Sequence, residues 1–275
     1  MISQSHIDEF QRNGAICLRG VFDQKWLDLL GSGIEKTRNG PGPFFCQYTS
    51  KNQQGDFYDD YCNWDKIDEY KDFLFHSPAA EIAGKSLHSN VIRLFHEHVL
   101  VKEPRTSEQT PWHHDQPYYC VDGEQVCSIW LPLDPVPKQS GLEFVAGSHT
   151  MGKMFMPLKF MTNLEYDYTP GSFDSIPDVE ANREKYDILS WDMDLGDCIV
   201  FHFKTLHSGK GNPDSSTRRR AFSSRWIGDD AVFAERPGET SPPFPELSHY
   251  KQGDSLHHSL FPVCWEKAHK NNTSS

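Results

Sequence analysis

The residues best suited to metal chemistry in this sequence are two histidines and an aspartate from two separate segments. His113 and Asp115 lie in the first segment, and the second, about ninety residues later, offers His202 and His207. Side chains two residues apart in a β-strand point to the same face, so a strand here would present His113 and Asp115 together. Two histidines and one carboxylate on one face form the facial triad that suits non-haem Fe(II) in oxygen chemistry.

We expect the third ligand to be His207 rather than His202. His202 falls inside an apolar segment that reads as a buried strand, whereas His207 lies just beyond it, beside Ser208-Gly209, where a side chain can face an open cavity. His114 alternates to the opposite face and is expected to be a hydrogen-bonded bystander. Four other histidines have no partner at ligand spacing and are not expected to be ligands, namely His149, His249, His257 and His258.

A run of three arginines follows His207 and indicates an anion site. Arg218 comes eleven residues after His207, and Arg225 is nearby. A planar guanidinium binds a carboxylate through two parallel hydrogen bonds, which a lysine cannot do. In a strand, Arg218 and Arg220 would share one face and Arg219 the other. One arginine of the run is therefore expected to face the metal and to bind the far end of a dicarboxylate.

Composition excludes several classes of protein. The 275 residues are 37% hydrophobic and 24% charged, which is typical of globular proteins. The net charge of −12 argues against nucleic acid or an anionic membrane as a partner. No long apolar run predicts a membrane span, and no signal peptide is visible. Seven cysteines without a Cys-x-x-Cys pair predict reduced thiols, so we expect a cytoplasmic protein.

The N-terminal part is predicted to be largely helical. Apolar spacing and breaker residues predict helices over residues 5–13, 26–37, 65–75 and 78–87. The first should begin with a capping box at Ser5 and Asp8 and stop at Gly14. Residues 15–22 read as a buried strand, and residues 39–64 as an irregular loop, which is either a plain surface loop or a substrate lid.

The remainder is predicted to be mainly β. Short apolar segments separated by proline and glycine occur at residues 90–102, around 113, and at 128–133, 142–145, 198–203 and 221–227. Helices followed by many short strands fit helices packed on a jelly roll. We predict one domain over residues 1–275, with a helical part at 1–88, a jelly-roll core at 89–230 and a C-terminal extension at 231–275. That extension contains a proline-rich loop at 237–245, a docking segment at 261–265 and a polar tail from 267.

Several motifs in order resemble the phytanoyl-CoA dioxygenase (PhyH) family of Fe(II)/2-oxoglutarate oxygenases, and the resemblance covers nearly the whole chain. The motifs are Phe10-x-x-x-Gly14, Leu18-Arg19-Gly20-Val21-Phe22, Leu100-Val101-Lys102-Glu103-Pro104, Thr110-Pro111-Trp112-His113-His114-Asp115-Gln116, Ile129-Trp130-Leu131-Pro132-Leu133-Asp134, Gly141-Leu142-Glu143-Phe144-Val145-Ala146-Gly147-Ser148-His149, Gly196-Asp197, Leu206-His207-Ser208-Gly209, Asn212 and Arg218-Arg219.

This resemblance implies a double-stranded β-helix (jelly-roll) fold and a set of site residues. It makes His113, Asp115 and His207 the iron ligands and Arg218 the residue that binds the far carboxylate of 2-oxoglutarate. Aligning on Ala221-Phe222 instead would move that role to Arg219. Three further residues are implied to line the cosubstrate pocket, namely Lys102, Trp130 and His98. Ser208-Gly209 departs from the family's usual Gly then Ser or Ala, so a hydroxyl contact to the cosubstrate is expected to be shifted or lost.

The resemblance also implies the reaction. Fe(II), 2-oxoglutarate and O2 would serve to hydroxylate an unactivated C–H bond of a small molecule, with release of succinate and CO2. Related halogenases lack the carboxylate ligand, so the presence of Asp115 favours oxygenation. The alternatives are a non-catalytic jelly-roll binding protein that retains the metal site, and a zinc hydrolase, for which the arginine has no obvious use.

The substrate and the oligomeric state are not readable from the sequence. An aromatic group could line an apolar or cation-binding pocket, or belong to the core, and it comprises Trp112, Tyr118, Tyr119, Phe44, Phe45 and Tyr48. The net negative charge of the protein weakly disfavours a coenzyme A ester as the substrate, because such an ester is itself an anion.

Overall fold

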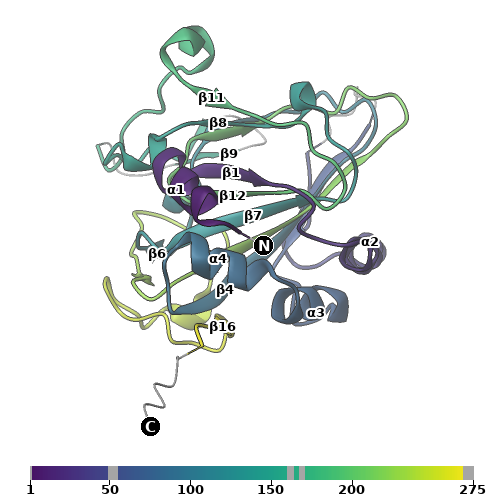
Figure 1. Ribbon diagram of the computed structural model, residues 1–275. Helices are drawn as coiled ribbons and strands as arrows, with labels where there is room; N and C mark the ends of the chain where they lie inside the picture. Colours follow the sequence, from purple (N-terminus) through teal and green to yellow (C-terminus); the bar gives the residue numbers. More distant parts are fainter. Residues whose placement is uncertain (1, 49–54, 160–163, 167–170, 269–275) are drawn as a thin grey trace.

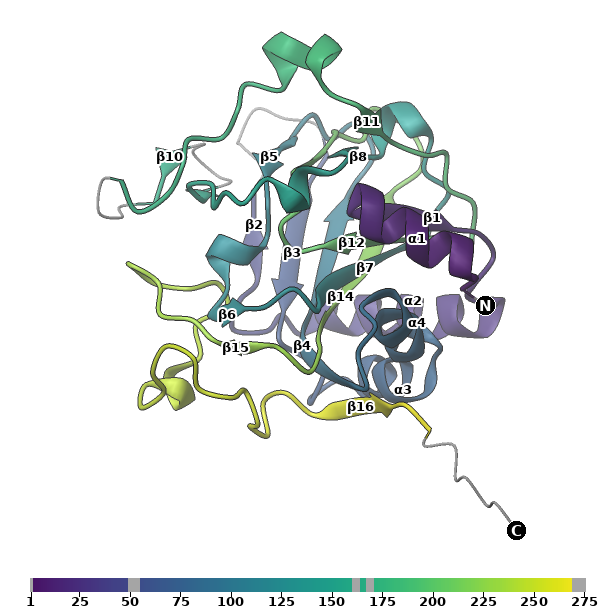
Figure 2. The same ribbon diagram turned by 60° about the vertical axis from the view of Figure 1, so that its left-hand side comes forward.

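Two antiparallel β-sheets face each other and form a double-stranded β-helix, with helices packed on one outer face (Figures 1 and 2). The computed structural model describes residues 2–48, 55–159, 164–166 and 171–268. Within this part of the chain, the larger sheet has eight strands and the smaller has four. The mainly β fold with N-terminal helices, predicted from the sequence, is confirmed. No helix in the described residues is long and apolar enough to cross a membrane.

The larger sheet follows the order β1-β12-β7-β14-β4-β3-β2, and β16 pairs with β4. Its strands are β1 (Ala15–Leu18), β2 (Cys46–Gln47), β3 (Phe57–Tyr61), β4 (Val91–Lys102), β7 (Val126–Pro132), β12 (Cys198–His202), β14 (Arg219–Ile227) and β16 (Val263–Glu266). Four of these strands come from outside residues 89–230, so the sheet extends beyond the predicted jelly-roll core. The division of the chain into one domain with three parts stays a prediction.

The smaller sheet follows the order β11-β8-β13-β5 and carries two of the candidate ligands. Its strands are β5 (Thr110–His113), β8 (Leu142–Val145), β11 (Ile188–Leu189) and β13 (His207–Gly209). Two short pairs lie beside the sheets, β9 (Leu158–Lys159) with β10 (Leu164–Glu165) and β6 (Val121–Asp122) with β15 (Val232–Phe233). The 3-10 turns are η1 (Gln116–Tyr118), η2 (Lys138–Ser140), η3 (Ser148–Thr150), η4 (Glu180–Lys185) and η5 (Pro245–Leu247).

All four predicted helices are present. They are α1 (Gln4–Asn13), α2 (Gln24–Asn39), α3 (Asp68–His76) and α4 (Ala79–Ser86). The predicted capping box is wrong in its register, because Ser3, not Ser5, caps α1 and does so together with His6. Gly14 ends α1 as predicted, in the left-handed conformation that glycine adopts without steric cost.

The helices cover the outer face of the larger sheet, where the main hydrophobic core lies. Phe222 and Trp226 of β14 point outward and are fully buried. The ring of Phe222 lies 4.9 Å from that of Tyr70 and 5.4 Å from that of Phe73, both on α3. Burial of such aromatic side chains fixes the sheet against the helices and leaves its inner face for the site.

Gly33 of α2 sits where the helix approaches Tyr70 too closely for a side chain. A Cβ atom at this position would lie 2.4 Å from Tyr70 Cε1, and Tyr70 is fully buried. Gly33→Ala is therefore expected to lower the free energy of unfolding by about 1–3 kcal/mol through overpacking. Gly31→Ala is the matched control on the same helix, because its nearest neighbour would be 3.8 Å away. There the better helix propensity of alanine should stabilise by up to about 1 kcal/mol. Urea unfolding measures both, and equal effects of the two substitutions would contradict this packing.

Candidate metal centre

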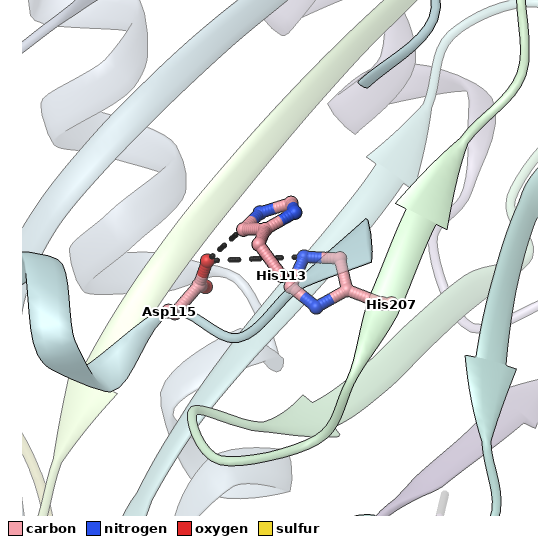
Figure 3. Close-up of side chains that lie close together, drawn as sticks. All are labelled: His113, Asp115 and His207. Atoms are coloured by element: carbon pink, nitrogen blue, oxygen red, sulfur yellow. Dashed lines mark ion pairs between the residues drawn. The ribbon is translucent and has the colours of Figure 1, made fainter. Parts of the chain in front are cut away.

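Three buried side chains, His113, Asp115 and His207, point toward one another between the two sheets (Figure 3). His113 ends β5 and lies directly opposite His207, which begins β13. Their ligand atoms and that of Asp115 all lie within 4.8 Å of one another. The Oδ1 atom of Asp115 is 3.7 Å from His113 Nε2 and 3.8 Å from His207 Nε2. The structure thus brings together the three residues predicted as iron ligands.

Asp115 reaches the cluster from a turn and not from a strand, so the strand argument that paired it with His113 is wrong. β5 ends at His113, and Asp115 has helical dihedral angles, φ −72° and ψ −36°. Backbone N–H groups of Asp115 and Gln116 donate to the carbonyl of Phe203 at 2.7 and 3.1 Å. These two hydrogen bonds anchor the turn to the chain just beyond β12, which turns the carboxylate back toward the histidines.

Each cluster histidine is oriented by a backbone carbonyl. Nδ1 of His113 lies 2.8 Å from the carbonyl oxygen of Pro111, and Nδ1 of His207 lies 2.9 Å from that of Thr205. A carbonyl only accepts hydrogen bonds, so each Nδ1 carries the proton and donates. The lone pair of each ring is therefore on Nε2, the atom that faces Asp115. In metal sites, a hydrogen bond from the ring nitrogen that does not bind the metal commonly fixes the tautomer of the histidine.

Burial and neighbouring charges hold the cluster in the protonation state that binds metals. Burial, and then the charge of His207, lower the pKa of His113 to about 3, and burial also lowers the pKa of His207. Burial alone would raise the pKa of Asp115, but the charges of His207 and Arg225 outweigh it and lower that pKa. At neutral pH the cluster therefore has two neutral imidazoles and one carboxylate, the donor set of the facial triad.

His202 and His114, which were not expected to be ligands, lie outside the cluster. His202 is buried and bonded on both ring nitrogens, to the backbone N–H of Lys204 and the carbonyl of Glu124. His114 accepts a hydrogen bond from the backbone N–H of Phe155 at 2.9 Å, and its Nδ1 lies 3.3 Å from the carbonyl of Lys204. His114 is thus hydrogen-bonded, as expected, and its role as a bystander stays a prediction.

The metal-free protein should lose stability as the pH falls below about 6.5, and His202 is one cause. Burial, and then the charge of His149, lower the pKa of His202 in the fold from 6.5 to about 3. Between these values the unfolded chain binds a proton that the folded chain does not. The free energy of unfolding therefore falls with decreasing pH by up to about 1.4 kcal/mol per unit from this residue. Urea unfolding between pH 7.5 and 5 should show a shallower slope for His202→Gln, and an unchanged slope would contradict the assignment.

A cavity between the sheets contains the triad and two of the predicted cosubstrate contacts, Trp130 and His98. Paired residues of antiparallel strands share a face, so the ladder register defines what points inward. Across β3, β4 and β14, one inward row is Phe57, Lys102 and Arg219, and another is Tyr61, His98 and Ser223. Lys102 is therefore on the same inner face as Trp130 and His98.

Arg218, predicted to bind the far carboxylate, does not point into this cavity. It precedes β14, its side chain is 33% exposed, and its guanidinium contacts Glu35 at 2.8 Å and Glu103 at 3.6 Å. Arg220 is also paired, with Asp134 at 2.8 Å. Alternation along β14 places these side chains on the outer side of the sheet. The predicted placement of Arg218 in the cavity is therefore wrong. The geometry supports Arg219, the alternative given by aligning on Ala221-Phe222.

Arg219 points inward and, with Lys102, forms a buried cationic pair. Both are more than nine-tenths buried and lie opposite each other in the ladder. Arg219 donates to the backbone carbonyls of Ser140 and Lys210, and the Lys102 ammonium donates to those of Glu108 and Lys210. Neither forms an ion pair with a carboxylate among the described residues. Burial lowers the pKa of Arg219 to about 10, and burial together with Arg219 lowers that of Lys102.

This cationic pair indicates an anion site on the inner face of the larger sheet, next to Phe57 of the cavity wall. Two buried positive charges without a countercharge are unfavourable until an anion binds. Gly209, which lines the cavity, is adjacent to Lys210, whose carbonyl contacts both cations. A dicarboxylate with one end at the triad and the other at Arg219 would supply the missing charge.

Ser208 does not provide a hydroxyl to this cavity. It pairs with Glu143 of β8, and its neighbours on β13, His207 and Gly209, are the residues that line the cavity. The reversed Ser-Gly order therefore turns the hydroxyl away, in agreement with the expected loss of that contact. Thr110 of β5 is the hydroxyl-bearing residue that lines the cavity beside Gly209.

Two residues that support Asp115 were not identified as functional from the sequence. Ser128 Oγ donates to Asp115 Oδ2 at 3.1 Å, and Arg225 Nε lies 4.0 Å from the same oxygen. Arg225 also donates to the Tyr119 hydroxyl at 2.6 Å. For Arg225, the sequence did carry a sign of this role, because Arg219, Ala221, Ser223 and Arg225 alternate along one strand and therefore share a face.

The aromatic residues divide between the cavity and its surroundings. Tyr118 and Tyr119 line the cavity, whereas Trp112 belongs to a separate hydrophobic cluster and donates to Glu180 at 2.9 Å. Phe44 stacks on Tyr61, and Phe45 packs against Tyr58. The prediction of an irregular loop over residues 39–64 is wrong for residues 46–47 and 57–61, which form the paired strands β2 and β3. Residues 49–54 of that loop lie outside the described part, as do residues 269–275 of the predicted polar tail.

Comparison with known proteins identifies a family model and a set of similar folds. The model described as phytanoyl-CoA dioxygenase (PhyH) matches residues 10–221. No curated protein matches the sequence significantly.

The similar structures include two proteins of nogalamycin biosynthesis. SnoK, a non-haem α-ketoglutarate-dependent carbocyclase, has a TM-score of 0.75 and 20% identity over 95% of this chain and 96% of its own. The epimerase SnoN, crystallised with Fe3+, α-ketoglutarate and nogalamycin RO, has a TM-score of 0.69 and 19% identity over 94% and 97%. EctD from S. alaskensis, crystallised with 2-oxoglutarate and 5-hydroxyectoine, has a TM-score of 0.66 and 17% identity over 92% and 85%. At these identities the likeness shows the fold.

Proposed function

This chain belongs to the phytanoyl-CoA dioxygenase family, and on that premise we propose that it is an Fe(II)- and 2-oxoglutarate-dependent dioxygenase. Its reaction would convert a substrate C–H bond, 2-oxoglutarate and O2 into the hydroxylated product, succinate and CO2. The substrate would be a small-molecule metabolite. The observation that carries the proposal is the buried His-Asp-His cluster together with a buried cationic pair on the inner face of the larger sheet, which has no carboxylate partner among the described residues.

The donor set fits Fe(II). Nε2 of His113, Nε2 of His207 and a carboxylate oxygen of Asp115 would hold the ion, and two imidazoles with one carboxylate are the donor set typical of non-haem Fe(II) oxygenases. Ser128 and Arg225 contact the second oxygen of Asp115, and this would orient the first oxygen, which faces the two histidines, for binding a metal ion. When bound, Fe(II) and 2-oxoglutarate supply the oxidising chemistry with O2.

The protein would position the cosubstrate through Arg219. Its guanidinium would bind the far carboxylate, and the Lys102 ammonium opposite it in the ladder would add a second positive charge. Trp130, Leu142 and Thr110 would form the walls between that end and the triad. A zinc hydrolase has no use for this buried, uncompensated arginine, so the oxygenase accounts for more of the site.

Aerobic incubation with a mixture of metabolites under 18O2 tests the proposal. With Fe(II) and 2-oxoglutarate, one compound should gain a single 18O atom, and succinate should form in equal amount. A product that is two hydrogens lighter and unlabelled, with succinate still formed, would show that hydroxylation is the wrong outcome. Absence of succinate from a metal-loaded protein across a broad substrate set would favour the non-catalytic binding protein.

A further inference from the structure

Asp59 places a buried carboxylate in the wall of the cavity, and no step proposed above uses it. It lies on β3, is 3% exposed and lines the cavity that contains the triad. Its Oδ2 atom accepts from the Tyr48 hydroxyl at 2.8 Å and lies 2.9 Å from His98 Nε2. Its Oδ1 atom is buried and has no hydrogen-bond partner among the described residues. The side chain is thus held rigidly by one oxygen while the other is left without a donor.

A buried carboxylate oxygen without a partner is unfavourable, because it has lost the water that bonded it in the unfolded chain. Tyr48 and His98 fix the carboxylate, so it cannot turn outward to recover that water. A molecule bound in the cavity and carrying a hydrogen-bond donor would satisfy Oδ1. The site therefore selects for a donor at this position.

The charges around the cavity favour a cationic donor over a neutral one. Arg225 lies beside Asp115, and the proposed function assigns Arg219 and Lys102 to the cosubstrate carboxylate. Among the described residues, no lysine or arginine forms an ion pair with Asp59, whose nearest ring nitrogen is Nε2 of His98 at 2.9 Å. A positive group on the substrate would balance the carboxylate.

Aromatic rings line the same space. The ring of Tyr61 shares the inward row of His98 and stacks on Phe44 at 4.8 Å, which fixes its orientation. Tyr118 and Tyr119 also line the cavity. Faces of such rings attract organic cations, and their apolar edges accommodate the carbon skeleton that carries the charge.

Resting on the proposed function, we propose that Asp59 is the substrate-recognition residue and that the substrate presents a protonated amine to Oδ1 of Asp59. His98 and Tyr48 act as positioning residues that hold the carboxylate. The prediction that His98 contacts the cosubstrate is thereby replaced by a role on the substrate side.

The test is a calorimetric titration of the anaerobic Fe(II)–2-oxoglutarate protein with matched probes. The probes are primary amines and the corresponding alcohols on butyl, cyclohexyl and phenethyl skeletons. The two members of each pair differ only in the hydrogen-bond donor and its charge. For at least one skeleton, the wild type should bind the amine about tenfold or more tightly than the alcohol. Asp59→Asn keeps the shape and the acceptor for Tyr48 but removes the charge, so the ratio should fall to about one. Asp56→Asn, the same substitution at an exposed position three residues away, should keep the wild-type ratio.

The outcomes separate this inference from its premise. 2-Oxoglutarate is titrated first, and failure of the wild type to bind it would overturn the proposed function. If 2-oxoglutarate binds equally to the wild type and Asp59→Asn, the amine-to-alcohol ratio decides the role of Asp59. Three results would overturn the role of Asp59. The wild type could bind alcohols as tightly as amines, the preference for amines could survive in Asp59→Asn, or neither series could bind. The wild-type ratio alone is decisive should the variant fold poorly.

Discussion

Arg219→Gln will weaken the binding of 2-oxoglutarate by about 100-fold, whereas Arg218→Gln will change it by no more than about twofold. A buried, charge-assisted bidentate pair contributes on the order of 1.5–3 kcal/mol, and each 1.4 kcal/mol is a factor of ten in affinity. Arg219 is buried on the inner face and bonds to two backbone carbonyls, whereas Arg218 is already paired with Glu35 on the outside. Calorimetric titration of 2-oxoglutarate into the anaerobic Fe(II) protein measures both.

Arg219→Lys separates charge from geometry in this experiment. It keeps the positive charge but not the two parallel donors, so its affinity should fall between those of the wild type and Arg219→Gln. A variant that unfolds in the absence of ligand would be revealed by circular dichroism and excluded. A larger loss of affinity in Arg218→Gln than in Arg219→Gln would contradict the inward placement of Arg219 and restore the assignment made from the spacing after His207.

His207→Gln will raise the dissociation constant for Fe(II) by more than about 100-fold and abolish succinate formation, because it removes one of three ligands. Loss of an orienting contact alone typically costs 10–100-fold, so loss of a ligand should cost more. His202→Gln is the matched control, since His202 was the rival ligand and both of its ring nitrogens are hydrogen-bonded, to Lys204 and Glu124. Its affinity for Fe(II) should stay within about threefold of the wild type. Anaerobic competition with a chromogenic chelator measures the affinities, and a comparable loss in His202→Gln would contradict the assignment of the third ligand.

The helices were predictable because their signals are local. Apolar spacing and terminal residues placed each within a few positions of its observed bounds, and Gly14 ended α1 where expected. The strand expected over residues 15–22 is shorter, Ala15–Leu18, and Gly20 just beyond it has a φ of 57° that does not continue a strand. Local sequence does not reveal where a strand stops pairing.

β3 was missed because its two aspartates are buried on opposite faces of the strand, Asp59 on the cavity side and Asp60 on the other. Asp59 and Asp60 are both buried, so the segment Phe57–Tyr61 lacks the alternation of apolar and polar residues that marks an ordinary half-buried strand. Carboxylates are rarely buried unless they are paired, and sequence patterns reflect that rule. For Asp59 the exception arises because β3 forms a wall of the candidate site, whereas Asp60 accepts a hydrogen bond from the backbone N–H of Gly42 at 2.7 Å. The missing alternation of apolar and polar residues in this strand thus coincides with a carboxylate in the wall of the candidate site.

The three predicted ligands lie together, although His113 and Asp115 do not share one face of a strand as expected. Residue types and spacing identified His113, Asp115 and His207, but Asp115 reaches them through a turn held by the carbonyl of Phe203. The identity of the inward arginine depended on where β14 begins, which the residue count after His207 could not determine. The strand register did so, because Arg219 pairs with Lys102 and shares its face.

The visible absorption spectrum of the anaerobic protein with Fe(II) and 2-oxoglutarate tests the central claim most directly. A keto acid that chelates Fe(II) gives a weak charge-transfer band. We predict this band in the wild type, no band in His207→Gln, and a band in Arg219→Gln only at much higher 2-oxoglutarate concentrations. A wild-type protein that binds Fe(II) but shows no band at saturating 2-oxoglutarate would contradict the account and leave the non-catalytic binding protein as the better description.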